Sequence, residues 1–352
     1  MHVHPRSNRF GGHERVDSER CVMAQSTIVR WSNPKVILVA TNLVEDHAFM
    51  LHAISQATLS RAKVLLVHVI PSFYLRSESV YETPFVQPVL AVRNVRAKLD
   101  EMAAAIREEG IECEPTILTG LPEEQIPLFV KSRIVDRVIV AARNATGVER
   151  LIGGSVAEAL ISGVEIPVCT IGRHMRPALA CATPPERILL ATSLQPESPM
   201  LASFASMLAE LHHSHLTLLH VLDSAGMTEP ERELARFRAR QKLSGLIPKK
   251  ARHRHQPVLL IPEGDPTKVI PDAAGSMSQD LVILGGPYPS LFSRILGTSV
   301  VHRVIVEAKC PVITIKSPVG SATERPFRRD AIDADATLAH SIGCTEEAVS
   351  GR

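Results

Sequence analysis

The sequence predicts an α/β protein made of two consecutive domains, each built around a parallel β-sheet with helices on both faces. Three observations support this: the chain repeats itself, its short apolar runs have the length of buried strands, and segments with helical spacing lie between those runs. Strands joined by helices require right-handed crossovers, which produce parallel, doubly wound sheets. The 352 residues are sufficient for two domains of ordinary size.

The repeat is clearest near the end of each half. The stretch LIGGSVAEALISGVEIPVCTIG, from Leu151, aligns without a gap with ILGTSVVHRVIVEAKCPVITIK, from Ile295. The same offset of 144 residues aligns GLPEEQIP with GDPTKVIP. The offset is larger for the earlier strands, so the first copy holds about eight extra residues, in the segment from Pro71 to Leu90. We infer an internal duplication.

The first copy contains five expected strands, of which the first two are continuous apolar runs typical of buried parallel strands. They are Val36–Ala40, Val64–Val69, Pro115–Leu118, Arg137–Ala141 and Val168–Ile171. Met50, Ile54 and Ala57 recur at helical spacing after the first strand. A longer helix is expected to end at Gly110, because glycine suits the left-handed residue that follows many helices. A short helix follows Pro122.

The second copy repeats this order of strands and helices. The expected core-facing residues of its first helix are Leu201, Phe204, Leu208 and Leu211. Its second helix is expected to begin after Thr228, because Glu231 three residues later completes a capping box. The domains are therefore placed at residues 34–173 and 185–317. Residues 1–33 and 318–352 show no sustained hydrophobic period and are predicted to be disordered tails.

Composition excludes several classes of protein. The formal net charge of +2 gives no support for binding nucleic acid or a membrane surface. No apolar run approaches the length of a membrane span, and the first 20 residues lack the apolar region of a secretory signal. The six cysteines form no CxxC pair, a pattern typical of reduced thiols. We therefore expect a cytoplasmic protein.

The two halves together resemble tandem universal stress protein domains of the UspA-like type. The segments that carry the resemblance are KVILVATN, VLLVHVIP, GLPEEQI, VDRVIVAA and LIGGSV…EIPVCTIG, with their second-copy counterparts. The resemblance implies five-stranded, flavodoxin-like domains. It also implies that the last strands, PVCTIG and PVITIK, pair across a pseudo-twofold axis between the two halves. The expected oligomeric state is either a monomer with this internal pseudo-dimer or a homodimer.

One branch of that family binds ATP through the motif G-x2-G-x9-G-[S/T]. The chemistry is general, because glycines let backbone N–H groups approach a phosphate and a helix N-terminus favours an anion. The motif positions are Ala141, Asn144, Gly154 and Ser155 in the first half, and Gly285, Tyr288, Thr298 and Ser299 in the second. Only Gly154 and Ser155 fit in the first half, and only Gly285 and Ser299 in the second.

The resemblance also implies a carboxylate just after the first strand of each domain. Asn42, which follows Thr41, and Ser193 stand there instead, so neither half keeps the acid at this position. The backbone after the second strand, at Val69 and Val221, could still bind an adenine edge, because any residue offers backbone groups.

The Gly-Ser step therefore has two interpretations. Ser155 with Glu158 three residues later forms a good capping box, which stabilises a helix by about 1 kcal/mol without any ligand. Alternatively, the first half keeps a degenerate pocket for ATP or AMP. The interpretation as a helix cap without any ligand is the stronger of the two, and more so for the second half.

Two histidine-rich runs, His212–His215 and His253–His255, lack a carboxylate or cysteine cluster at ligand spacing, so no metal site is predicted. His68 and His220 occupy equivalent strand positions and are interpreted as hydrogen-bonded structural residues. Hydrolase, P-loop and dinucleotide motifs do not occur.

We expect a non-catalytic stress-response sensor or adaptor, with protein partners that the sequence does not name. The alternatives are an ATP- or AMP-binding regulator and, less favoured, an ATP-processing enzyme of the same superfamily.

Overall fold

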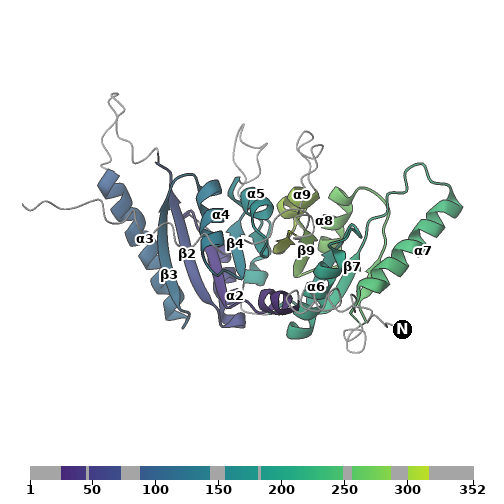
Figure 1. Ribbon diagram of the computed structural model, residues 1–352, viewed down its shortest axis with the longest axis horizontal. Helices are drawn as coiled ribbons and strands as arrows, with labels where there is room; N and C mark the ends of the chain where they lie inside the picture. Colours follow the sequence, from purple (N-terminus) through teal and green to yellow (C-terminus); the bar gives the residue numbers. More distant parts are fainter. Residues whose placement is uncertain are drawn as a thin grey trace, which may run out of the picture. The chain divides into compact units, whose positions relative to one another are not determined.

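The computed structural model describes residues 25–44, 47–72, 88–142, 155–180, 184–248, 256–286 and 300–316. In this part of the chain, ten strands form a single sheet in the order β3-β2-β1-β4-β5-β10-β9-β6-β7-β8 (Figure 1). The first half supplies β1 Val36–Ala40, β2 Lys63–Ile70, β3 Cys113–Thr119, β4 Arg137–Ala141 and β5 Val168–Ile171. The second half supplies β6 Arg187–Ala191, β7 His215–Leu219, β8 Val258–Leu260, β9 Leu281–Gly285 and β10 Val312–Ile315. The predicted strands of the first half are confirmed, and the second half repeats them in the same order along the chain.

The two halves meet through their last strands. All paired strands within a half are parallel, whereas β5 and β10 pair antiparallel with Cys169 opposite Ile313. The pairing of PVCTIG with PVITIK across a pseudo-twofold axis is therefore confirmed.

Helices cover both faces of the sheet. The first face carries a helix over residues 25–32, together with α2 His47–Ser60, α3 Pro88–Glu108, α6 Ser198–His212 and α7 Glu229–Leu246. The second face carries α4 Pro122–Ser132, α5 Ser155–Gly163, α8 Pro266–Ser276 and α9 Val300–Glu307. The central strands, such as β1 and β6, read as apolar runs because they are buried from both sides, whereas the edge strands β3 and β8 are only partly buried.

Local signals mark several helix ends as expected. Gly110 has φ 77°, which glycine adopts without strain. The Thr228 N–H donates to Glu231 Oε2 at 2.8 Å, so the capping box of α7 is confirmed. Along α6, Phe204 is fully buried as predicted, but Leu211 is 46% exposed. That part of the prediction was wrong because Leu211 lies in the last turn of the helix, near its end.

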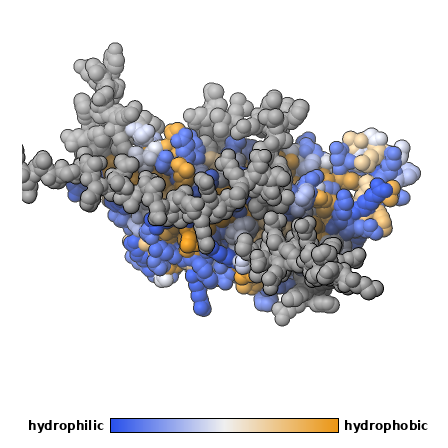
Figure 2. Space-filling model, viewed as in Figure 1, coloured by the Kyte–Doolittle hydropathy of each residue, from blue (hydrophilic) through white to orange (hydrophobic). Residues whose placement is uncertain are grey.

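The outer strand of the second half is short. β8 has three residues, and a short edge strand offers little backbone for pairing with another chain. Figure 2 shows hydrophobic as well as hydrophilic residues on the surface of the second half. Phe237 on α7 is 57% exposed and Val258 on β8 is 51% exposed.

The predicted N-terminal tail was wrong for residues 25–33, because residues 25–32 form a helix. Ile28 and Trp31 are buried in the core of the first face, and Arg30 forms an ion pair with Asp136. A helix of two turns is too short to show a hydrophobic period, and packing against the sheet stabilises it.

Each half anchors its first strand to one aspartate. Asp136 Oδ2 accepts hydrogen bonds from the backbone N–H groups of Lys35, at 2.7 Å, and Val36, at 3.0 Å. Asp280, 144 residues later, accepts from the N–H groups of Glu186, at 3.1 Å, and Arg187, at 3.0 Å. Each carboxylate thus fixes the start of a central strand.

The segment between the halves packs against α2. Its short helix η3, Pro177–Ala180, presents the Leu179 carbonyl to His52 Nδ1 at 3.3 Å, so this nitrogen carries the proton. His52 Nε2 lies 3.8 Å from the Cys169 Sγ. Burial lowers the pKa of His52 to about 4, so the imidazole is neutral at pH 7.

We predict that Asp136→Ala lowers the free energy of unfolding by about 2–4 kcal/mol, because two backbone N–H groups and Arg30 lose the buried carboxylate that accepts from them. Urea unfolding measures the loss. Asp280→Ala is the matched variant in the second half and should be similarly destabilised. Glu229→Ala, which removes an exposed pair with Arg232, is the control. A loss for Asp136→Ala no greater than that of the control would contradict the anchoring role.

A second prediction concerns pH. Because the pKa of His52 falls from 6.5 to about 4 on folding, the unfolded chain binds more protons between these values. The contribution of His52 to the free energy of unfolding is therefore fully present above pH 6.5. It is lost as pH falls toward 4, by up to about 3 kcal/mol. His52→Gln should flatten the pH dependence of urea unfolding in this window. His47→Gln, at an exposed position of the same helix, should leave it unchanged. Parallel curves for wild type and His52→Gln would refute the assignment.

Candidate functional site

The candidate nucleotide site lies at the carboxyl ends of the central strands. Thr41 and Asn42 directly follow β1, Ala141 ends the neighbouring β4, and Val69 lies near the end of β2 on the other side. The structure therefore brings these four predicted residues together. This edge is where open α/β sheets bind ligands.

The turn after β1 is held by side chains. Thr41 Oγ1 accepts a hydrogen bond from the Leu43 N–H at 2.9 Å, and Asn42 Oδ1 accepts from the Val44 N–H at 2.7 Å. Leu43 has φ 67°, a left-handed conformation that these two bonds favour. An aspartate at position 42 could accept the same bond. Asn42 thus keeps the shape of the turn and removes its negative charge.

The second half has the same turn with different polar partners. Thr192 Oγ1 accepts from the Leu194 N–H at 3.2 Å, and Leu194 has φ 61°. Thr192 also donates to Ser198 Oγ at 2.7 Å. The Ser193 hydroxyl lies 3.5 Å from Glu197 Oε1.

Glu197 is a site residue that the sequence did not indicate. It precedes α6 and is only 5% exposed, and a Cβ atom on Gly285 would lie 3.8 Å from its Oε1. The second half thus holds a carboxylate beside Ser193, although the acid is absent from the position after β6. Its only sequence signal was an acidic residue just before the expected helix.

Two histidines fix these turns from the neighbouring strands. His68 Nδ1 lies 2.9 Å from the Thr41 carbonyl oxygen, and His220 Nδ1 lies 2.9 Å from that of Thr192. Because a carbonyl only accepts, each Nδ1 carries the proton and donates it. The prediction that both are hydrogen-bonded structural histidines is confirmed.

The backbone of β2 is directed into the site. Val67 C=O accepts from the Thr41 N–H at 2.9 Å, and Val69, two residues further, points its backbone groups to the same side. Since β1 pairs only as far as Ala40, the groups of Val69 extend past its end. Val221 lies equivalently in the second half, where Leu219 C=O accepts from the Thr192 N–H.

The segments that would contact phosphate are not described. Asn144, Gly154, Tyr288, Thr298 and Ser299 lie outside the described residues, as does the side chain of Ser155, the first residue of α5. The choice between helix cap and phosphate turn therefore stays a prediction.

The strand register nevertheless supports the constant offset used to align the motifs. Ala141 is opposite Ile171, and Gly285 is opposite Ile315. Gly285 is 144 residues after Ala141, and Ile315 is 144 residues after Ile171, the same offset as in the sequence alignment.

Over the described ranges, no three His, Cys, Asp or Glu side chains lie close enough to hold a metal ion. His212 and His215 fall at the end of α6 and the start of β7, and residues 253–255 are outside the described part. None of the described helices is long and apolar enough to span a bilayer.

Comparison with known proteins identifies relatives of both halves. A model of the universal stress protein family matches residues 34–171 and again residues 185–316. Universal stress protein MJ0531 of Methanocaldococcus jannaschii is 28% identical over 123 residues, which cover 34% of this chain and 71% of that protein.

A solved structure of another universal stress protein has the same fold over most of the chain. A universal stress protein from Archaeoglobus fulgidus superposes with a TM-score of 0.59 at 16% identity, covering 80% of this chain and 96% of the other. A second protein of that organism, solved in complex with dAMP, is 21% identical over 39% of this chain and 98% of its own, with a TM-score of 0.29.

Proposed function

Because the chain belongs to the universal stress protein family, we propose that it is a non-catalytic stress-response protein that acts by binding, as a sensor or adaptor. One observation carries the proposal: both halves keep the hydrogen-bonded turn after their first strand, but with Asn42 and Ser193 where a carboxylate is expected. The turn keeps its shape in both halves, whereas the position after the first strand carries no negative charge in either. The stress-response part of the proposal rests on family membership.

The chemistry at this edge supports a binding role. His68 and His220 each commit Nδ1 to a carbonyl of the turn. A histidine used in this way holds the backbone, whereas a general base in a nucleophilic pair is oriented toward a hydroxyl or thiol. In the second half the Ser193 hydroxyl is directed to the Glu197 carboxylate at 3.5 Å, with the neighbouring Thr192 hydroxyl bonded to Ser198.

A nucleotide is the second candidate ligand, and the first half is the candidate site. Asn42, Val69 and Ala141 lie together at this edge, and Gly154 and Ser155 follow in the sequence. Weak binding of ATP or AMP here would make the protein a nucleotide-dependent regulator.

We predict that the wild-type chain neither hydrolyses ATP nor binds it more tightly than about millimolar, because the carboxylate that could accept bonds from ribose hydroxyls is missing. Asn42→Asp should keep the turn and tighten ATP binding by about tenfold, since a hydrogen bond to a charged acceptor is worth about 1.5–3 kcal/mol. Isothermal titration with ATP and AMP, after a check for co-purified nucleotide, measures both.

Two further results are informative. Micromolar, one-site ATP binding abolished by Gly154→Trp would replace the adaptor proposal by the nucleotide regulator. ATP hydrolysis lost in both Asn42→Ala and Ser155→Ala would overturn the non-catalytic role. Ser193→Asp is the matched control, because it adds the same charge to the second half, where Glu197 already supplies one.

A further inference from the structure

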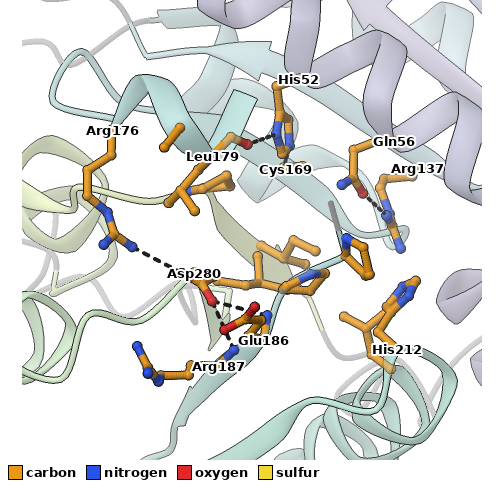
Figure 3. Close-up of a pocket in the computed structure, with 17 residues that line it drawn as sticks. His52, Gln56, Arg137, Cys169, Arg176, Leu179, Glu186, Arg187, His212 and Asp280 are labelled. Carbon is orange, nitrogen blue, oxygen red and sulfur yellow. Dashed lines mark hydrogen bonds and ion pairs between the residues drawn. The ribbon is translucent and has the colours of Figure 1, made fainter. Parts of the chain in front are cut away.

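A separate cavity of about 310 Å³ lies at the opposite ends of the strands from the nucleotide site, on the first face where the two halves meet (Figure 3). Arg137 and Leu281, the first residues of β4 and β9, both line it. So do Cys169 and Ile313, which are opposite each other in the central β5–β10 pair. The cavity is therefore built on the pseudo-twofold axis.

The two halves contribute different chemistry to this cavity. Arg137 and Leu281 are equivalent positions of the repeat, as are Cys169 and Ile313. The first half thus supplies a cation and a thiol where the second supplies two aliphatic side chains. A ligand that fits this cavity would have a polar end and an apolar end.

Arg137 is a buried cation without a carboxylate partner among the described residues. Arg137 is only 2% exposed. Its guanidinium donates hydrogen bonds to Gln56 Oε1 and to the Trp31 carbonyl oxygen, each at 2.8 Å. Its Nε has no hydrogen-bond partner within the described structure. The adjacent Asp136 is already engaged by Arg30 and by two backbone N–H groups. A buried charge that lacks a counter-charge is costly, and an anion in the cavity would supply one.

Other polar groups of the lining are consistent with an anion. Arg176 donates to Asp280 Oδ1 at 3.1 Å and to the Gln279 carbonyl at 2.7 Å, whereas its Nε, also buried, lacks a partner in the described part. Asp280 is occupied by this contact and by two backbone N–H groups. Burial, followed by the charge of Arg137, lowers the pKa of His212. Glu186 and Arg187, which also line the cavity, are exposed residues of opposite charge, so the buried charge without a counter-charge is that of Arg137.

The remaining walls are largely apolar. They are formed by Ala178, Leu179, Pro184, Pro185, Leu208, Leu281, Pro311 and Ile313. Figure 3 shows Leu179 among side chains that lie between Arg176 on one side and Arg137 on the other. Ligand pockets are commonly of this size and combine apolar walls with a few polar groups.

We propose that this cavity binds a small organic carboxylate, with its head on the Arg137 guanidinium and its apolar body against Leu281 and Ile313. Guanidinium recognises carboxylate through short, charge-assisted hydrogen bonds. The competing explanation is that Arg137 only joins the helix over residues 25–32 to α2 and β4. That role needs no ligand and predicts no selectivity for an anion.

The test is a titration of the full chain with benzoate and hexanoate, and with benzyl alcohol as the neutral probe of similar size. Side-chain NMR signals of His52 and His212 report occupancy, because both residues line the cavity. We expect one saturable site for the carboxylates and binding of benzyl alcohol weaker by about tenfold or more. No saturable change with either carboxylate, or equal binding of benzyl alcohol, would overturn the proposal.

Variants separate the cavity from the structural role of Arg137. Arg137→Lys keeps a charge but removes the planar donors, and should weaken benzoate binding by about tenfold. Arg238→Lys, at an exposed arginine of α7, is the matched control and should bind as wild type does. Ile313→Phe narrows the cavity without altering Arg137 and should also weaken binding. If a folded Ile313→Phe or Arg137→Lys chain, checked by circular dichroism, binds benzoate as tightly as wild type, the proposal is wrong.

Discussion

The antiparallel pairing of β5 with β10 is the contact on which the rest of the structure depends. It joins two parallel sheets into one, and both strands are buried along their whole length. Without this pairing each half would expose β5 or β10 as an apolar edge strand with unpaired backbone groups. The same pairing places Cys169 opposite Ile313 and so creates the floor of the central cavity. The duplicated halves are therefore parts of one sheet.

Comparison of the halves separates the residues that hold the backbone from those that line sites. The aspartate before the fourth strand and the histidine bonded to the first turn occur in both, as Asp136 with Asp280 and His68 with His220. The lining positions differ, with Asn42 replaced by Ser193 and Arg137 by Leu281 in the second half. The scaffold contacts are repeated because both halves need the same backbone. The sites differ because nothing in the fold requires them to match.

The sequence predicted what depends on local pattern and on the repeat. The strands of the first half were found because its buried central strands are apolar runs, and the residues of the nucleotide edge were indicated by the resemblance to universal stress proteins. The helix over residues 25–32, the Glu197 carboxylate and the buried Arg137 were missed. Each depends on contacts between distant segments, such as Arg30 with Asp136, which leave no periodic signal. Gly154 and Ser155 remain predictions.

The two candidate sites share their structural elements. β4 begins with Arg137 at the cavity and ends with Ala141 at the nucleotide edge, a span of about 13 Å for five residues. Helix α2 likewise begins after the Asn42 turn and carries Gln56, which binds Arg137, near its other end. Both elements are packed in the core. Under the proposed adaptor function, β4 and α2 are the elements that join the two candidate sites.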